Sequence, residues 1–380
     1  MESTPFMRTV FTYLTVVILF VQSLFGVVSK EDFEFYRDAL KDTDAVINER
    51  HAGTPSEYRW SADSEFDISE CFTVKKEKGK DFTVLNIADI HFSDLDYRAY
   101  YAFHSMRVVK RLVTEYKPDL ITLTGDNVCA DSTCWSISRL TKFMDSFGIP
   151  WAPVYGNHDD EGNCDLNYLS DVMTSSRYCL FKKGDPSMGN GNYIINVEEG
   201  DGDDAKVVET VFMMDSHHST VNDAQQAWFT WAADGIEASL GYRPEISVFF
   251  HIPIAEYQYG YDLNRDEADK KWIADGAMGV RHEEICCERN GDGPVQRGVF
   301  DTLKAGGTKY IFCGHDHINN FTFDYEGVRL TYCTKVGRGS GYQPGIDGGT
   351  VIRVSSDGIK SITARTYVAG IGADLWKFER

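Results

Sequence analysis

Five short apolar segments of this chain each lead directly into a polar cluster, and they lie at 83–88, 120–124, 151–155, 246–250 and 309–313. The clusters draw on three residue types and supply Asp89, His91, Asp126, Asn157, His158, His251, His315 and His317. Amphipathic helical patterns at 99–116 and 137–147 separate the first three segments, which predicts parallel strands. Parallel strands end at one edge of a sheet, where open α/β sheets build their sites. Core packing does not explain this repetition, so the clusters predict one functional site.

The rest of the chain continues the alternation of strands and helices. A strand is predicted at 207–214 and a helix at 223–240, and after Phe323 the sequence becomes rich in glycine and in strand-forming residues. Before the first cluster we expect a polar helix at 31–50 and an extended segment at 71–74. This order predicts an α/β fold with a mixed sheet at its C-terminal end.

The spacing and chemistry of the clusters indicate metal ions. Asp126 follows Asp89 by 37 residues and Asn157 follows Asp126 by 31, each about one β-α-β unit. Residues two apart in an extended segment share a face, so Asp89 and His91 can serve the same site. Carboxylate, amide and imidazole groups without thiolate suit pairs of Mn, Fe or Zn ions. Taken singly, Asp-x-His is more typical of a solvated surface and His251 could be a core histidine, but the ordered set favours metal ligation.

Charge restricts the class of partner. The 380 residues carry a formal net charge of −20, and such a surface repels polyanions at long range. A nucleic-acid partner is therefore disfavoured. A small phosphorylated substrate, or an exposed phosphate on a phosphoprotein, can still enter a locally positive metal site.

The N-terminus predicts export. Arg8 precedes an apolar run that extends to Val21, which is the pattern of a secretory signal peptide at 1–29, cleaved after Ser23 or Ser29. The alternative is a retained anchor, because the apolar stretch is just long enough to span a bilayer. We expect a secreted or lumenal protein that contacts a membrane only if this segment is retained.

Export also permits disulfides and glycosylation. The chain has nine cysteines, and Cys129/Cys134 and Cys164/Cys179 are the locally plausible pairs, although spacing does not determine connectivity. Asn320 begins an acceptor sequence for an N-linked sugar, so a glycoprotein is expected.

The order of these motifs resembles the calcineurin-like metallophosphoesterase superfamily over residues 82–366 and, within it, the purple-acid-phosphatase-related branch. The segments that carry the branch resemblance are 149–152, 156–162, 191–193, 214–217, 249–253 and 314–317. The resemblance implies a four-layer α/β/β/α sandwich, with two mixed sheets flanked by helices and two metals at its edge. We place this metallophosphoesterase domain at 76–380, with a cap or insertion at 255–299 and an N-terminal helical extension and linker at 30–75.

The resemblance also implies roles for the polar residues. One metal would be held by Asp89, His91, Asp126 and His317, and the second by Asp126, Asn157, His251 and His315. His158 would face the leaving oxygen as a catalytic residue. Purple acid phosphatases carry a tyrosine ligand three residues after the Gly-Asp aspartate, where this chain has Cys129. A colourless relative is therefore expected.

The resulting hypothesis is hydrolysis of phosphoesters, foremost phosphomonoesters, by metal-activated hydroxide at a dinuclear centre. The alternatives are a phosphodiesterase or nuclease on the same core and a catalytically silent metal-binding scaffold. For several other residues the sequence is compatible with a purely structural role as well as a functional one. His217 or His218 could line the pocket, Arg338 could contact phosphate instead of forming only a turn loop, and Asp159 could orient His158 instead of serving only in a turn.

Overall fold

The computed structural model describes residues 5–24, 29–30, 33–34, 50–93, 99–130, 133–268, 270–290, 293–337, 345–368 and 371–380. Most of the helix predicted at 31–50, and the loop around Arg338, lie outside these residues.

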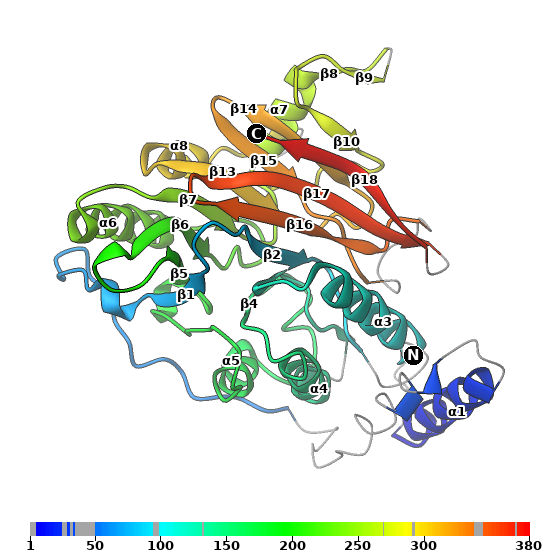
Figure 1. Cartoon of the computed structure of the whole chain (residues 1–380). Coiled ribbons are helices and arrows are strands. Elements are labelled where there is room, and N and C mark those ends of the chain that lie inside the picture. Colours follow the sequence, from blue (N-terminus) through cyan, green and yellow to red (C-terminus); the bar gives the residue numbers. More distant parts are fainter. Residues whose placement is uncertain are drawn as a thin grey trace.

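Two β-sheets form the centre of the molecule (Figure 1). The larger contains, in spatial order, β1 (Phe72–Lys76), β5 (Tyr193–Glu199), β6 (Lys206–Met213), β7 (Glu245–Phe249), β13 (Thr308–Cys313), β15 (Val328–Tyr332), β14 (Asn320–Tyr325) and β10 (Met278–Val280). The smaller contains β18 (Ile371–Glu379), β17 (Gly358–Val368), β16 (Gly348–Ser355), β2 (Phe82–Ile87), β3 (Leu120–Thr124) and β4 (Trp151–Val154). Both sheets combine parallel and antiparallel pairs, as predicted.

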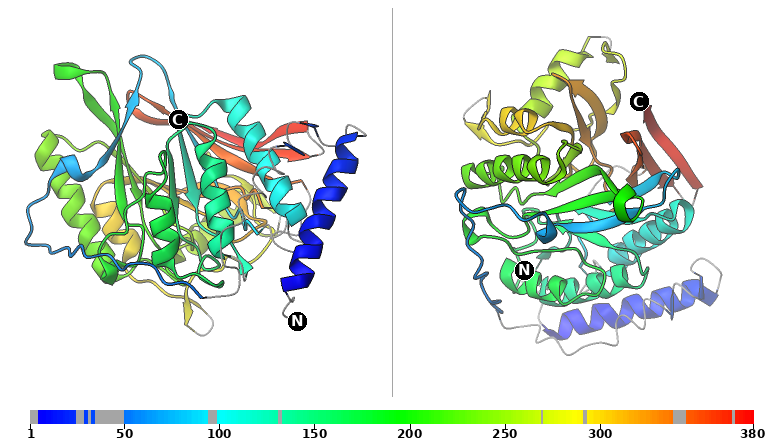
Figure 2. Two further views of the ribbon diagram at one scale, coloured as in Figure 1. Left: turned by 90° about the horizontal axis from the view of Figure 1, so that it is seen from below. Right: turned by 60° about the vertical axis from the view of Figure 1, so that its left-hand side comes forward.

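Helices cover the outer faces of both sheets. Those beside the six-stranded sheet are α3 (Ala99–Tyr116), α4 (Thr133–Asp145) and α5 (Leu166–Thr174). Those beside the eight-stranded sheet are α6 (Asp223–Leu240), α7 (Ala255–Asn264) and α8 (Val299–Ala305). The two sets lie on opposite sides of the molecule, and the turned view in Figure 2 shows the layers in succession. The predicted α/β class and its arrangement of two mixed sheets with flanking helices are confirmed.

The inner faces of the two sheets share one hydrophobic core. Leu85 and Val351 of the smaller sheet belong to the same buried cluster as Val211 and Phe312 of the larger. All positions of β2, β3 and β4 are buried, because this sheet is covered on one face by helices and on the other by its partner. Strands buried on both faces read as continuous apolar runs, which explains why they were visible in the sequence.

The segment before β2 is part of the packed structure. β1 lies within the extension predicted at 30–75, ends at residue 76, and pairs in parallel with β5 of the larger sheet. Upstream of β1, the backbone amide of Trp60 donates to Asp185 Oδ2 at 2.7 Å, and the indole of Trp231 donates to the carbonyl of Ser64 at 2.8 Å. Residues 51–76 therefore dock onto the two-sheet core through strand pairing and hydrogen bonds.

The predicted insertion at 255–299 consists of α7 and several short strands. The strands are β8 (Arg265–Asp266), β9 (Lys271–Trp272), β10, β11 (Arg289–Asn290) and β12 (Gly293–Pro294). β10 pairs with β14, so the insertion extends the larger sheet, while the β8–β9 hairpin projects at the top of Figure 1. Tyr257 of α7 is fully buried and donates to the carbonyl of Ile311 at 2.9 Å. This tyrosine anchors α7 to the sheet.

The N-terminal segment forms helix α1 (Pro5–Leu24), which lies beside α3 (Figure 2). Across the described parts of the chain, no helix is both long and apolar enough to cross a membrane. Export of the chain stays a prediction.

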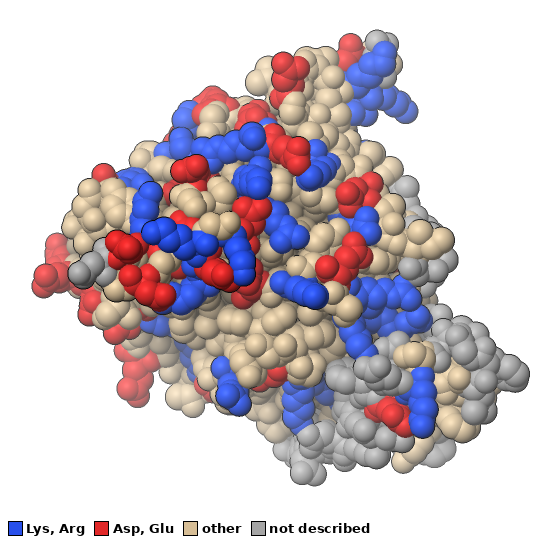
Figure 3. Space-filling model, viewed as in Figure 1, with Lys and Arg blue, Asp and Glu red and all other residues tan. Residues whose placement is uncertain are grey.

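Charges of both signs alternate on the face shown in Figure 3. Ion pairs also join distant segments of the chain, including Lys360–Asp81 at 2.9 Å, Arg365–Glu115 at 2.7 Å and Arg380–Glu245 at 2.7 Å. The acidic balance of the chain is therefore not expressed as a patch of one sign on this face.

Candidate metal centre

All eight polar residues singled out in the sequence lie at one edge of the sandwich. β2, β3 and β4 run parallel to one another, and so do β7 and β13, so each group of strands ends at a common edge. The loops that follow these five strands carry Asp89, His91, Asp126, Asn157, His158, His251, His315 and His317. Residues 226 positions apart meet here, as when the amide of His315 donates to Asp89 Oδ1 at 3.1 Å.

Seven of these residues divide into two groups that share Asp126. In the first, one ligand atom each from Asp89, His91, Asp126 and His317 lies within 4.8 Å of the others. In the second, ligand atoms of Asp126, His251 and His315 meet the same limit. Asn157 joins the second group through its Oδ1, which lies 3.1 Å from His251 Nε2. The shared Asp126 Oδ2 lies 3.1 Å from His91 Nε2 and 3.3 Å from His251 Nε2.

Glycines allow the loops to approach this closely. A Cβ added at Gly125 would lie 2.5 Å from His251 Nδ1, and one at Gly156 would lie 2.3 Å from Asp126 Oδ1. The ligand residues themselves have left-handed backbone, with φ of 52° at Asp89 and 48° at Asp126. Non-glycine residues adopt this conformation at a cost of about 1–3 kcal/mol, and such strain concentrates at functional sites.

Backbone and side-chain hydrogen bonds orient the candidate ligands. His251 Nδ1 faces the carbonyl oxygen of Thr124 at 2.9 Å, and since a carbonyl only accepts, Nδ1 holds the proton of the neutral ring, which leaves the Nε2 lone pair available to a cation. The amide of His158 donates to Asp126 Oδ1 at 2.9 Å, which leaves Oδ2 directed at the histidines. Asp159 accepts from the amides of Gly156 at 2.7 Å and Val128 at 2.9 Å. Asp159 thus ties the loops after β3 and β4 together.

The site fits metal ions because it buries donor atoms that the described protein does not satisfy. His91 Nε2 and Asp126 Oδ2 are buried, yet neither makes a hydrogen bond to any part of the chain that the structure describes. Buried polar atoms are normally paired. Converging carboxylate oxygens and imidazole nitrogens are the donor set that Mn, Fe and Zn accept. Two groups of this kind could therefore hold two cations.

The electrostatics of the protein groups at the site point the same way. Burial, with a contribution from Asp126, raises the pKa of Asp89 to about 6. Burial opposes protonation of His251, but Asp126 and Asp89 outweigh it and raise the pKa of His251 to about 10. Burial and the nearby His251 and His91 lower the pKa values of His315 and His317 to about 3. One imidazolium thus compensates the carboxylates, while neutral imidazoles remain ready to bind a cation.

His158 lies at the open side of the two groups. Its Nε2 is 4.0 Å from Asp126 Oδ2, its Nδ1 is 2.7 Å from Glu161 Oε1, and its side chain is 34% exposed. Burial lowers its pKa, but Asp126 and Glu161 outweigh that effect, so the net shift is upward. The sequence analysis missed Glu161 and considered Asp159 as the orienting residue. Glu161 follows His158 by three residues, and side chains at i and i+3 can meet within one turn. This spacing was the signal in the sequence that could have identified Glu161 as a partner of His158.

The loop after β6 lies beside the site. Ser216 Oγ accepts from the amide of Ile252 at 3.0 Å, which places this loop against the residue that follows His251. His217 Nε2 lies 3.2 Å from Gln225 Oε1, whereas His218 Nε2 lies 3.2 Å from Asp160 Oδ2 at the surface. Neither histidine belongs to the two ligand groups that share Asp126.

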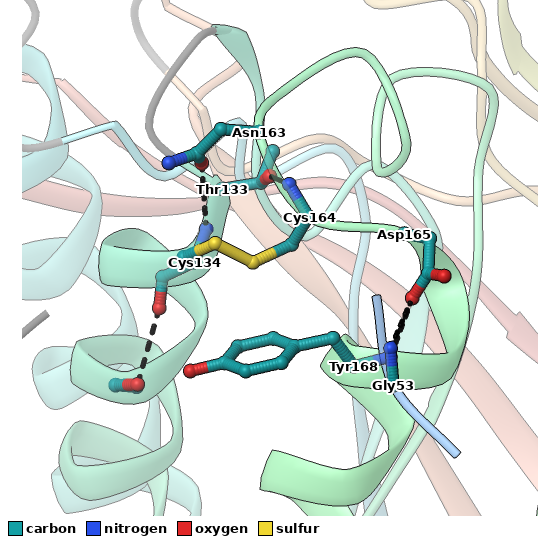
Figure 4. The surroundings of a disulfide bond; sticks show 8 residues. Gly53, Thr133, Cys134, Asn163, Cys164, Asp165 and Tyr168 are labelled. Carbon is teal, nitrogen blue, oxygen red and sulfur yellow. Dashed lines mark hydrogen bonds between the residues drawn. A yellow bond between two sulfur atoms is a disulfide. The ribbon is translucent and has the colours of Figure 1, made fainter. Parts of the chain in front are cut away.

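The predicted disulfide pairs are wrong. Cys134 bonds to Cys164, with their Cα atoms 5.3 Å apart (Figure 4). Cys134 lies at the start of α4 and Cys164 just before α5, so packing of these two helices brings together residues that are 30 positions apart. Cys129 instead donates a hydrogen bond to the carbonyl of His91 at 3.4 Å. Sequence spacing had favoured disulfides that close short loops, whereas the packing of α4 against α5 produces a disulfide between cysteines 30 residues apart.

The fold and the two groups of candidate ligands define this chain as an α/β sandwich protein with a candidate two-metal centre. The sequence profile described as Calcineurin-like phosphoesterase matches residues 82–319, and the chain belongs to this family. The family is one of metallophosphoesterases, generally phosphatases with a dinuclear metal centre.

Similar proteins include purple-acid-phosphatase-like chains. The "Probable inactive purple acid phosphatase 28" of Arabidopsis thaliana is 28% identical over 301 residues, which cover 69% of this chain and 70% of that protein. "Phosphatase DCR2" of Saccharomyces cerevisiae is 28% identical over 232 residues, 56% of this chain but only 38% of its own length. The solved structure of purple acid phosphatase PPD1 from yellow lupin shares 9% identity at a TM-score of 0.47, covering 79% of this chain and 54% of that one.

Proposed function

We propose that this chain hydrolyses phosphomonoesters at a dinuclear metal centre. One observation carries the proposal: every candidate ligand position has a residue that can bind a metal ion, and these residues form two groups that share the buried Asp126. Asp89, His91, Asp126 and His317 would hold one cation. Asn157, His251 and His315, together with Asp126, would hold the other.

The chemistry divides between the cations and the protein. Paired cations of Mn, Fe or Zn supply Lewis-acid activation of water and of the phosphoryl oxygens. The protein fixes the ligands through buried strand ends and through the hydrogen bond between His251 Nδ1 and Thr124. These contacts exist before substrate binds, so little reorganisation is needed during the reaction.

His158 is the residue placed to handle a proton. The contact between its Nδ1 and Glu161 Oε1 fixes the ring, while its Nε2 faces the ligand groups near Asp126. An imidazolium held in this way can donate from Nε2 to the leaving oxygen, and general acid catalysis of this kind contributes about 10²–10⁴-fold to rate. Glu161 favours the protonated form by its charge, as the raised pKa of His158 reflects.

The charge of the chain supports a small substrate. With a net charge of −20, long-range repulsion disfavours nucleic acid. A phosphomonoester, free or on a phosphoprotein, presents its charge at one point that can reach the metals.

Cys129 stands where purple acid phosphatases have their tyrosine ligand, so we propose that the metal-loaded protein is colourless.

The names of the similar proteins include both probable inactive proteins and a phosphatase, and an experiment has to distinguish these two possibilities for this chain. Three of the similar proteins, all from Arabidopsis thaliana, are called probable inactive purple acid phosphatases, and one is called a phosphatase. The experiment is elemental analysis of purified protein together with a panel of phosphomonoesters and phosphodiesters. We expect about two ions per chain and faster hydrolysis of monoesters. Faster hydrolysis of diesters would favour the phosphodiesterase alternative. A metal content well below two with no hydrolysis would favour a silent scaffold.

A further inference from the structure

A loop of the insertion is fastened to the metal-ligand loop after β13. Asn319 Oδ1 accepts from the amides of His282 at 2.9 Å and Glu283 at 3.1 Å. In return, the amide of Ile318 donates to Glu283 Oε1 at 2.9 Å. These reciprocal contacts hold residues 282–286 of the insertion against residues 316–319.

This attachment brings Cys286 next to two potential ligands. The amide of Cys286 donates to Asp316 Oδ2 at 3.1 Å. Asp316 is only 5% exposed, whereas Cys286 is exposed. The Cys286 sulfur, a carboxylate oxygen of Asp316 and a ring nitrogen of His315 all lie within 4.8 Å of one another. The thiol is therefore reachable from solvent and already faces two donor groups.

We infer that Cys286, His315 and Asp316 form a third cation site, which takes a thiophilic divalent ion such as Zn²⁺ and inhibits the enzyme. Thiolate, imidazole and carboxylate are the usual protein ligands of Zn²⁺, and three of them leave a fourth position for water. Mn²⁺ and Mg²⁺ prefer oxygen ligands, so the sulfur distinguishes this site from the two groups that share Asp126. On binding, the cation replaces the thiol proton, which passes to solvent.

The inhibitory effect follows from His315, which belongs to both sites. Its Nδ1 lies 3.3 Å from His251 Nε2 in the second ligand group, and His315 is also a member of the Cys286 group. A cation bound beside Cys286 places positive charge against that group and competes for its imidazole. Turnover is then expected to fall as the third ion binds. This step rests on the proposed phosphatase function, whereas the existence of the site does not.

The test uses the full chain loaded with two equivalents of Mn²⁺ and titrated with Co²⁺ or Zn²⁺. Co²⁺ reports directly on the site, because its bond to a thiolate produces a charge-transfer absorption band. We expect the band and one additional bound ion in the wild type, and neither in Cys286→Ser. Loss of one ligand should weaken binding at least about tenfold, since even outer partners of a ligand are worth about 10–100-fold in metal affinity. Cys287→Ala, which alters the neighbouring buried thiol, should keep the band.

Activity is measured on the same samples. Added Zn²⁺ should inhibit the wild type and Cys287→Ala at concentrations at least about tenfold lower than Cys286→Ser, and Cys286→Ser without Zn²⁺ should retain wild-type turnover. A cobalt band that persists in Cys286→Ser, or no band in the wild type, overturns the site. A band without any loss of turnover overturns the inhibitory role. If no preparation hydrolyses phosphoesters, the proposed function fails, while the band still decides whether the site exists.

Discussion

The replacement Asp126→Asn tests the centre at the residue that joins its two halves. Asp126 has φ of 48°, and asparagine adopts this left-handed conformation more readily than other non-glycine residues. Its side-chain carbonyl can still accept from the amide of His158, now 2.9 Å from Asp126 Oδ1. The variant therefore removes one negative charge and one shared ligand with little change in shape.

The expected loss can be worked out from the charges. Asp126 Oδ2 is flanked by His91 Nε2 at 3.1 Å and His251 Nε2 at 3.3 Å, so a cation held by these groups would lie close to the carboxylate. Two unit charges about 4 Å apart interact by about 4 kcal/mol at an effective dielectric constant of about 20. Since about 1.4 kcal/mol is a factor of ten, turnover should fall by about 10³-fold or more. Both cations should also bind more weakly.

The assay combines metal content, hydrolysis of a phosphomonoester and thermal unfolding with and without added metal. Asp160→Asn is the matched control, because it removes the same charge from a nearby loop where the carboxylate contacts His218. We expect the control to keep its metals and its activity. An Asp126→Asn protein that binds two ions and retains more than about a tenth of wild-type turnover would refute the assignment of Asp126 as the shared ligand.

Four further outcomes are expected. His158→Gln should lower turnover by about 10²–10⁴-fold, the usual contribution of a general acid, while the metal content stays near that of the wild type; unchanged turnover would remove its catalytic role. Glu161→Gln should shift the alkaline limb of the pH–rate profile to lower pH, because Glu161 raises the pKa of His158 and its loss lets the imidazolium deprotonate earlier; an unmoved limb would contradict this orientation. Replacing Cys134 and Cys164 together by alanine should lower the free energy of unfolding by about 3–4 kcal/mol, the value for a loop of this length, which denaturant titration would measure; the Cys129→Ala control should show no such loss. Removal of metal by a chelator should lower Tm, because each cation at a thousandfold excess over its Kd stabilises the folded state by about 4 kcal/mol; equal Tm values by calorimetry would argue against bound cations.

The strand ends could be found from sequence because burial leaves a clear local pattern. β3 is buried at all five positions and was predicted with the same limits, 120–124, as was α3 with its amphipathic face. Elements with weaker patterns escaped notice. α5 and β5 lie within a long stretch without a strong period. β1 was expected as an extended segment at 71–74, but its pairing with β5, a strand far from it in the chain, was not predicted. Such pairings depend on long-range contacts that no local window contains.

The sequence alone determined an α/β fold and a set of aspartate, asparagine and histidine residues at successive strand ends. Both could be predicted because they depend on the order of apolar, helical and polar segments along the chain, which neighbouring residues specify. Tertiary structure alone decided that Glu161 orients His158, that Cys134 pairs with Cys164, and that Cys286 meets His315. Those outcomes depend on which loops and helices pack together. Packing is set by the free energy of the whole core and not by the spacing of any one motif.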